Sequence, residues 1–201
     1  MARKDNKRRR WDDVGTGGRY AERQADLCSR IGAGLTKDMT VLELCCGAGQ
    51  LTLPLCGTVA LWEATDPSAA AIARARRIPH SDRLRFSVMD AEGMPFEHST
   101  FDAVVAFDAL QSMQSPESAL REIRRVLRPG GILFAPTFMY GGRKPDLHTR
   151  LTELTGRRIR HRWMASEFLD LIRRYGFTIE KAVLVPDESA PICYLEARNL
   201  K

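Results

Sequence analysis

The chain has 201 residues, of which 44% are hydrophobic and 7% aromatic, the proportions of a soluble protein with one well-cored domain. No apolar run approaches the roughly 18 residues of a membrane span, and the polar N-terminus lacks the apolar core of a secretory signal. Five cysteines without regular spacing exclude a disulfide framework or a zinc motif. We therefore expect a cytoplasmic protein with reduced thiols and no resident metal.

The net charge of +6 is concentrated at the N-terminus. Residues 1–10 contain six basic residues and one acidic residue, so they carry +5 of the total. The rest of the chain is nearly neutral. Residues 1–15 are predicted to form a basic disordered arm, for which weak attraction to phosphate is the commonest further role.

The elements alternate between helix and strand from the start of the predicted domain, residues 16–201. Gly18–Ile31 has apolar residues at helical spacing and is followed by two glycines. Val41–Leu44 is predicted as the first strand, Gln50–Cys56 as a short helix and Val59–Thr65 as the second strand.

A second helix and two more strands follow. Asp66, Pro67 and Ser68 begin an alanine-rich helix over residues 67–77, with Pro67 expected at the first helical position and Ser68 in the first turn. Leu84–Met89 and Phe101–Phe107 are predicted strands, and the second of these is an apolar run typical of a parallel strand buried on both faces.

The next predicted unit is a helix, a turn and a strand. Pro116–Leu127 places its apolar residues on one helical face. Arg128–Gly131 is predicted as a tight turn, and Ile132–Met139 as the fifth strand. A polar, basic segment at about 140–163 then interrupts the alternation, and we expect it to cap the ligand-binding edge of the sheet.

The C-terminal part is predicted to close the sheet. Ser166 is expected to cap a helix that stops at Gly176. Phe177–Val185 and Ile192–Ala197 are predicted as two antiparallel strands joined by a short turn. The expected fold is α/β: a Rossmann-like, doubly wound, mostly parallel seven-stranded sheet with a C-terminal antiparallel hairpin.

The first strand carries the most informative motif, because it ends in a carboxylate and runs into a small-residue turn. Glu43 is followed by Cys45, Cys46, Gly47 and, after Ala48, Gly49. Such a turn lets a ligand approach the backbone closely. The segment therefore predicts a pocket for a nucleotide-like ligand.

Two ligand classes fit such a turn, because both use an acid about 20 residues later to hold ribose hydroxyls. Asp66 is in the right place for either class. The dinucleotide fingerprint, however, requires a third glycine where this chain has Thr52, and a carboxylate at Glu43 is unexpected in it.

From about Met39 to Leu200 the chain resembles the class I S-adenosylmethionine-dependent methyltransferases, especially the small-molecule enzymes akin to the ubiquinone and menaquinone methyltransferases. The segments that carry this resemblance occur in the family's order, and they are residues 43–49, 66–68, 90–96, 101–105 and 120–131.

The resemblance implies a cofactor, S-adenosylmethionine, and a role for individual residues. Glu43 would anchor the methionine amino group, Asp66 the ribose hydroxyls, and Asp90 with Ala91 would flank the adenine. Phe107 and Asp108 would line the methionine side, and Tyr20 would close over its carboxylate. The predicted cofactor-binding residues are Tyr20, Glu43, Cys45, Cys46, Gly47, Gly49, Asp66, Pro67, Asp90, Ala91, Phe107 and Asp108.

The chain departs from the family pattern in two places. Cys45 replaces the usual first glycine, so we expect this position not to adopt positive φ easily, although a thiol still leaves the backbone accessible. After the fourth strand, where relatives often have paired histidines, this chain has residues Ala109–Ser112. Any role of those histidines cannot be transferred.

Methyl transfer by in-line attack needs positioning and no obligatory acid or base. No catalytic residue is assigned. If the acceptor must lose a proton, His148, His161 and Tyr140 are the candidate bases by their location.

Three alternatives remain beside a small-molecule methyltransferase. The basic arm could recruit RNA as the acceptor, or the protein could bind the cofactor without catalysis. A cluster of Cys45, Cys46 and Cys56 could hold a soft metal, although small packing residues are the simpler interpretation. The acceptor and the oligomeric state are not indicated by the sequence.

Overall fold

The computed structural model describes residues 18–141, 159–187 and 190–200, with the side chains of residues 18–21 left out. The predicted basic arm and most of the predicted cap at 140–163 lie outside these residues. Both assignments, and the domain boundaries built on them, stay predictions.

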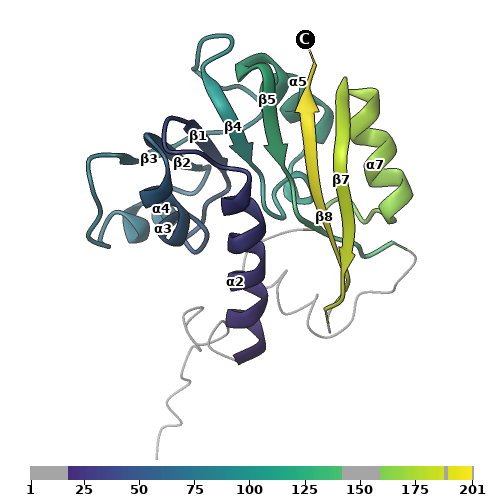
Figure 1. Ribbon diagram of the computed structural model, residues 1–201, viewed down its shortest axis with the longest axis horizontal. Coiled ribbons are helices and arrows are strands. Elements are labelled where there is room, and N and C mark those ends of the chain that lie inside the picture. The colour runs from purple at the N-terminus through teal and green to yellow at the C-terminus, as the bar shows by residue number, and fades with distance from the viewer. Residues whose placement is uncertain (1–17, 142–158, 188–189, 201) are drawn as a thin grey trace, which may run out of the picture.

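The described residues form one sheet with parallel strands on one side and antiparallel strands on the other (Figure 1). The strands are β1 (Thr40–Leu44), β2 (Leu61–Asp66), β3 (Leu84–Val88), β4 (Phe101–Val105), β5 (Leu127–Phe134), β6 (Thr137–Phe138), β7 (Phe177–Val185) and β8 (Ile192–Asn199). Their order is β3-β2-β1-β4-β5-β8-β6, and β7 also pairs with β8. The first five strands pair in parallel, and β8 pairs antiparallel with β5, β6 and β7.

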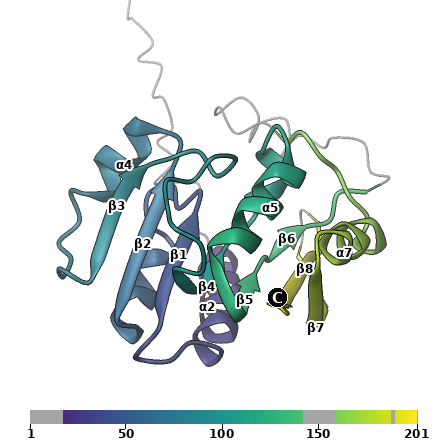
Figure 2. The same cartoon turned by 90° about the horizontal axis from the view of Figure 1, so that it is seen from above.

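Helices cover both faces of this sheet, as Figure 2 shows from above. They are α2 (Gly18–Ala33), α3 (Thr52–Leu55), α4 (Ala69–Ala75), α5 (Pro116–Val126) and α7 (Ala165–Arg174). Successive side chains of β1 point to opposite faces, since Val41 joins the apolar cluster under α2, α3 and α4, whereas Leu42 joins the cluster under α5 and α7. The predicted Rossmann-like, doubly wound, mostly parallel arrangement is confirmed.

The predicted fifth strand is broken in two. β5 ends at Phe134, and the chain resumes as the two-residue β6 after Pro136. Proline has no N–H to donate to the next strand, so it interrupts the ladder at this point. The sheet therefore has eight strands where seven were predicted. Residues 128–131, predicted as a tight turn, belong to β5, where a register irregularity between β4 and β5 and the positive φ of Gly130 accommodate them.

Two helices begin one or two residues away from their predicted starts. Ser68 lies outside the first turn of α4 as its N-cap, and its Oγ accepts a hydrogen bond from Ala71 N, so the helix begins after Pro67 and not at it. Met164, not Ser166, is the N-cap of α7, and the carboxylate of Glu167 accepts from Met164 N. The short helix predicted over 50–56 is α3 followed by one 3-10 turn.

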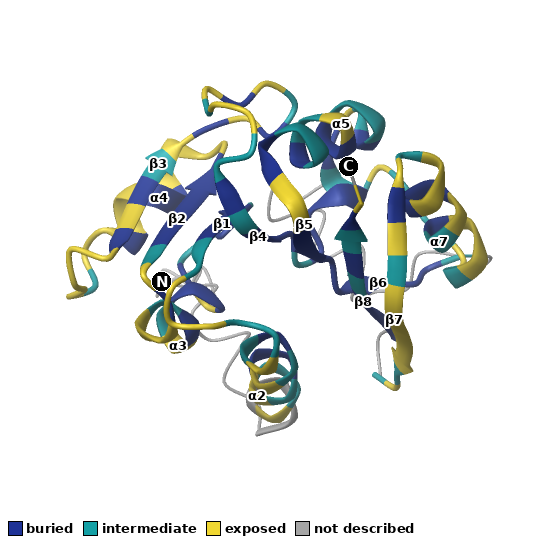
Figure 3. Ribbon diagram, turned by 45° about the horizontal axis from the view of Figure 1, so that its top comes forward, coloured by how far each residue is buried: buried dark blue, intermediate teal, exposed yellow. Residues whose placement is uncertain are grey.

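Burial differs across the sheet, as Figure 3 shows. The central strands β1, β2 and β4 are almost wholly buried, whereas most of β7 is exposed. Among the described residues, no helix has both the length and the apolar character that crossing a membrane requires.

Candidate functional site at the carboxyl edge of the sheet

The loop after β1 turns sharply through three residues of positive φ. Cys45 has φ 56°, Gly47 has φ 59° and Gly49 has φ 85°. The expectation that Cys45 would avoid this region is wrong. The loop is held there by local hydrogen bonds, because Cys46 N donates to Thr65 O and Gly49 N donates to Cys46 O. A non-glycine residue in the left-handed region costs about 1 kcal/mol or more, and this strain sits at the predicted binding loop.

Asp66 joins the ends of β1 and β2. One carboxylate oxygen accepts from Gly47 N at 2.9 Å and the other from Ser68 N at 2.8 Å. Asp66 is nearly buried, and a Cβ built on Gly47 would meet nothing within 4 Å, so the loop has an open side at this glycine. The backbone thus fixes the orientation of the Asp66 carboxylate.

Glu43 lies below this loop and is buried, and its carboxylate is held by two donors. Its Oε2 accepts from Thr52 Oγ1 at 2.6 Å and from Trp62 Nε1 at 2.8 Å. Burial raises the pKa of Glu43 to about 7, although these two hydrogen bonds act in the opposite direction. Sequence reasoning noted Thr52 only as a missing glycine and did not assign Trp62. The sequence held one signal for the contact between Thr52 and Glu43, which is that a hydroxyl stands in place of the third glycine.

Cys28, Cys46 and Cys56 pack in or against the apolar cluster under α2, α3 and α4. Burial raises the pKa of Cys28 to about 11, and it raises the pKa values of Cys46 and Cys56 as well. All five cysteines are outside disulfides. Within the described part of the chain no group of three or more His, Cys, Asp or Glu side chains could hold a metal ion, so the soft-metal alternative has no support.

The turn after β3 brings Asp90 and Ala91 to the same edge, beside the end of β2. Asp90 is exposed and accepts from Glu92 N, whereas Ala91 is buried. Glu92 in turn accepts from Gln114 N and Ser115 N, which ties this turn to the loop before α5.

Phe107 and Asp108 follow β4, the other neighbour of β1. Asp108 has φ 51° and is buried, and its Oδ1 accepts from Phe138 N and from the side-chain amide of Gln111. The backbone carbonyl of Gln111 accepts hydrogen bonds from Arg160 N and His161 N. Gln111 therefore connects the end of β4 to the segment before α7, a role that no sequence pattern indicated.

Helix α2 lies over the same edge. Gln24 donates to Gln50 O in the first loop, and Arg23 forms an ion pair with Asp187 at the end of β7. Tyr20 belongs to α2, but its side chain is outside the described residues. Its predicted contact with the cofactor stays a prediction.

The candidate bases are placed differently. Tyr140 is buried and stacks on Phe138, with ring centroids 5.9 Å apart, and the guanidinium of Arg162 lies over its ring. His161 stacks on Trp163, and its Nε2 lies 3.2 Å from Met113 O. His148 is outside the described residues.

With Tyr20 set aside, the predicted cofactor residues all lie at the carboxyl ends of four neighbouring strands, β3, β2, β1 and β4. Their chemistry fits an adenosyl amino acid. An ionised carboxylate offers about four acceptor positions, so Asp66 retains capacity for ribose hydroxyls after its two backbone bonds. Glu43 and Asp108 are buried carboxyl groups at the ends of the neighbouring strands β1 and β4.

Comparison with known proteins supports this assignment. A family described as "Methyltransferase domain" matches residues 42–135. The ubiquinone/menaquinone biosynthesis C-methyltransferase of Hahella chejuensis is 32% identical over 114 residues, which cover 53% of this chain and 45% of that protein. The chain thus spans less than half the length of this relative.

Two solved structures share the fold over nearly the whole chain. The N-methyltransferase NodS of Bradyrhizobium japonicum, bound to S-adenosyl-L-homocysteine, has a TM-score of 0.74 at 20% identity and covers 94% of this chain and 91% of its own. The [4+2]-cyclase SpnF has a TM-score of 0.74 at 25% identity, with coverage of 92% and 83%.

The motifs, the strand order and these matches agree with one another. Residues 42–135 match the family described as "Methyltransferase domain", and the strand order around them belongs to a fold that the chain shares with NodS and SpnF.

Proposed function

We propose that this protein transfers a methyl group from S-adenosylmethionine to a small-molecule acceptor. The observation that carries the proposal is the pairing of Asp66 with the glycine loop, in which Gly47 N donates to the Asp66 carboxylate at 2.9 Å. This contact presents a fixed carboxylate beside an open stretch of backbone. A sulfonium-bound methyl group supplies the chemistry, and the protein supplies position.

In this proposal different residues contact different parts of the cofactor. Asp66 binds the ribose, and the loop backbone from Cys45 to Gly49, with Pro67, borders the methionine and the ribose. Asp90 and Ala91 border the adenine. Tyr20 closes over the methionine carboxylate.

Three side chains remain, Glu43, Phe107 and Asp108. Phe107 would line the methionine side, and the two carboxyl groups would attract the methionine ammonium. We expect Glu43 to reach it through water, while Thr52 and Trp62 hold its Oε2 in place. Binding of an ammonium nearby favours ionisation of Glu43 and opposes the effect of burial on its pKa.

An aromatic row beside the end of β4 suggests the kind of acceptor. Phe107 and Phe138 have ring centroids 6.3 Å apart, and Phe138 stacks on Tyr140. Phe107 is only half-buried. Phe138 and Tyr140 are buried, with Arg23 and Arg162 over their rings, so Phe107 is the ring of this row that can meet a ligand. Its face favours a planar, largely apolar acceptor, because aromatic faces pack best against flat apolar surface.

The test has two stages. Calorimetry with S-adenosylhomocysteine should give saturable binding to one site, and absence of binding to folded protein would refute the cofactor pocket. Turnover of S-adenosylmethionine is then measured with a panel of planar and aliphatic acceptors. Methylation of planar acceptors in preference to aliphatic ones, with a KM for the acceptor about tenfold higher in Phe107→Ala, is the expected result.

Two outcomes would favour another function. Binding without turnover over the whole panel would indicate a protein that uses the pocket without methyl transfer, and the cyclase SpnF illustrates that the fold is compatible with other chemistry. Methylation of RNA that is lost on deletion of residues 1–10 would favour an RNA acceptor. We also propose a cytoplasmic location, which cell fractionation can test.

A further inference from the structure

Two open cavities lie between α5 and α7, and neither is lined by a predicted cofactor residue. The first measures about 470 Å³ and lies near the N-terminal ends of the two helices. The second measures about 420 Å³ and lies near their C-terminal ends. Arg174 lines both.

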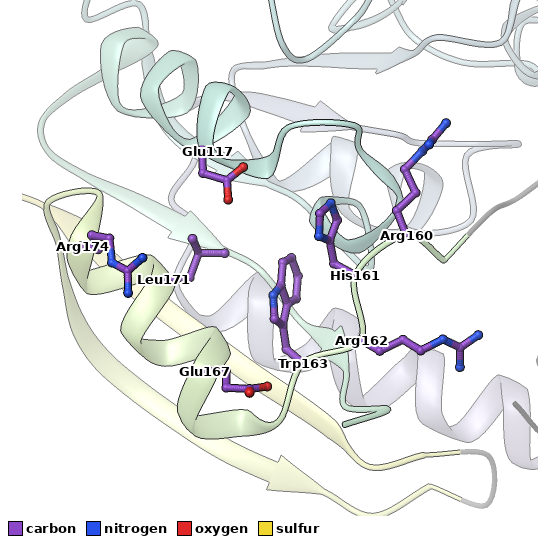
Figure 4. Close-up of a pocket in the computed structure, with 8 residues that line it drawn as sticks. All are labelled: Glu117, Arg160, His161, Arg162, Trp163, Glu167, Leu171 and Arg174. Atoms are coloured by element: carbon purple, nitrogen blue, oxygen red, sulfur yellow. The ribbon is translucent and has the colours of Figure 1, made fainter. Parts of the chain in front are cut away.

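The first cavity is mixed in charge. Figure 4 shows Glu117 and Leu171 facing the same space from the two helices, whereas Arg160 and Arg162 extend away from it. Glu167 also lines this cavity. Its two carboxylates make it a poor receptor for an anion.

The second cavity has only neutral and basic lining residues. We define the arginine cavity by the residues that line it, which are His98, Arg121, Arg124, Arg125, Arg174, Tyr175 and Gly176. No carboxylate lines it, and four of the seven residues are arginines. Like charges in proximity repel, so an anion bound among these arginines would stabilise the arrangement.

Three of these arginines have no carboxylate partner within the described part of the chain. Arg121 donates to Ser118 Oγ and lies over the ring of Tyr175, and the structure gives the side chains of Arg124 and Arg174 no partner. The Nε of Arg124 is buried and unpaired. The terminal nitrogens of Arg124 are not among the buried unpaired atoms, so they are the atoms that can donate to an anion in the cavity.

Arg125 has a different role. It forms an ion pair with Glu122 and donates to the carbonyls of Met94 and Phe96, so it holds the turn before β4. It belongs to the wall of the cavity and is already satisfied.

Helix capping does not explain the arginines of α5. The carbonyls at its C-terminal end already have donors: Asn199 Nδ2 donates to Arg124 O, Ser99 N to Arg125 O and Thr100 N to Val126 O. The guanidinium groups of Arg121 and Arg124 are therefore not needed there as caps. Gly176 also leaves room for one of them, because a Cβ at this position would lie 2.8 Å from Cζ of Arg124.

We propose that the arginine cavity binds a compact, phosphate-dense anion, such as the di- or triphosphate group of a small molecule. Arginine suits this ligand, because its planar fork donates two parallel hydrogen bonds to phosphate oxygens. The ring of Tyr175 is covered by Arg121, and the other ring that lines the cavity is the imidazole of His98. The arginines therefore dominate the chemistry of the cavity, and phosphate is the group that they recognise.

The experiment is calorimetric titration of the full chain with inorganic tripolyphosphate at low ionic strength. The variants are Arg121→Gln and Arg174→Gln, both of exposed side chains. Arg173→Gln is the matched control, because Arg173 is adjacent, exposed and paired with Asp170, and it does not line the cavity. Any binding by residues 1–10 contributes equally to all three variants.

We expect saturable binding of one tripolyphosphate, weakened about tenfold or more in each cavity variant and unchanged in Arg173→Gln. Affinity for S-adenosylhomocysteine should be the same in all variants, which separates this proposal from the proposed methyl transfer. Equal affinity in the cavity variants and the control would overturn the proposal. Binding of single-stranded RNA without binding of tripolyphosphate would also overturn it, because it would indicate an extended surface and not a compact site.

Discussion

The carboxyl edge of the sheet and the arginine cavity between α5 and α7 hold their charges in opposite ways. At the edge, Glu43, Asp66 and Asp108 are buried acids, and each accepts hydrogen bonds from protein donors. In the cavity, Arg121 and Arg174 are exposed bases without a carboxylate partner among the described residues. The protein itself fixes the geometry of the edge, whereas Arg121 and Arg174 keep donors that no described carboxylate of the protein uses.

Removing Asp66 is the strongest test of a preformed edge. Asp66→Ala should weaken binding of S-adenosylhomocysteine at least about 100-fold, or about 3 kcal/mol, because charge-assisted bonds to two ribose hydroxyls are lost together with the bond to Gly47 N. Calorimetry measures the effect. Asp102→Asn is the matched control, since this acid accepts from Thr40 N at the opposite edge of the sheet. Equal losses in both variants would mean that Asp66 matters only for folding.

The pH dependence of stability tests whether Glu43 is a buried acid in the free protein. Burial raises its pKa from 4.5 to about 7, so its contribution to folding is fully present below pH 4.5 and is lost as the pH rises through 7. We expect the free energy of unfolding to fall by about 2–3 kcal/mol between pH 5 and pH 8, measured by urea denaturation without cofactor. Glu43→Gln should flatten this dependence. An equally steep profile in the variant would assign the effect to other groups.

The hydrogen bond from Thr52 to Glu43 gives a second test of the buried acid. Thr52→Val removes one donor to the Glu43 carboxylate and keeps the volume, so it should destabilise the protein by about 2 kcal/mol at pH 8. At pH 5 the loss should be smaller, because Glu43 is then protonated. Thr52→Ser keeps the hydroxyl and should show little of this pH dependence. A loss in Thr52→Val that is the same at both pH values would contradict the proposed pairing.

The smallest effect is expected at Cys45. Because this residue has φ 56°, Cys45→Gly should relieve backbone strain and raise the free energy of unfolding by about 1 kcal/mol or less, after the entropy of glycine in the unfolded chain is counted. Cys45→Val should be destabilising, since a branched side chain is disfavoured at this φ. Thermal denaturation of both variants gives the sign, and a clear loss of stability in Cys45→Gly would show that thiol packing outweighs the strain.

The sequence predicted the edge well because its information is local. Glu43, Gly47 and Asp66 stand at the ends of consecutive apolar runs, and parallel strands bring such ends together. The mostly parallel arrangement followed from the alternation of helix and strand. The errors lay at helix starts, such as the caps at Ser68 and Met164, and in the fifth strand, which includes the predicted turn at 128–131 and breaks before β6.

The partners of the site could not be predicted in the same way. Trp62 and Thr52 meet Glu43 from separate elements, so their contacts depend on packing and not on spacing along the chain. The break at Pro136 and the positive φ of Cys45 are also consequences of tertiary context. The residues of the arginine cavity come from three places in the sequence: the turn before β4, helix α5 and the C-terminal end of α7. In the sequence these residues look like ordinary solvated charges.

The central claim is that the carboxyl edge of the sheet holds the adenosyl cofactor through Asp66. A crystal structure with S-adenosylhomocysteine tests it directly. The account predicts the ribose hydroxyls within hydrogen-bond distance of the Asp66 carboxylate and the homocysteine beside the open face of Gly47. Electron density for the ligand elsewhere on the protein, with Asp66 making no contact to it, would contradict the account.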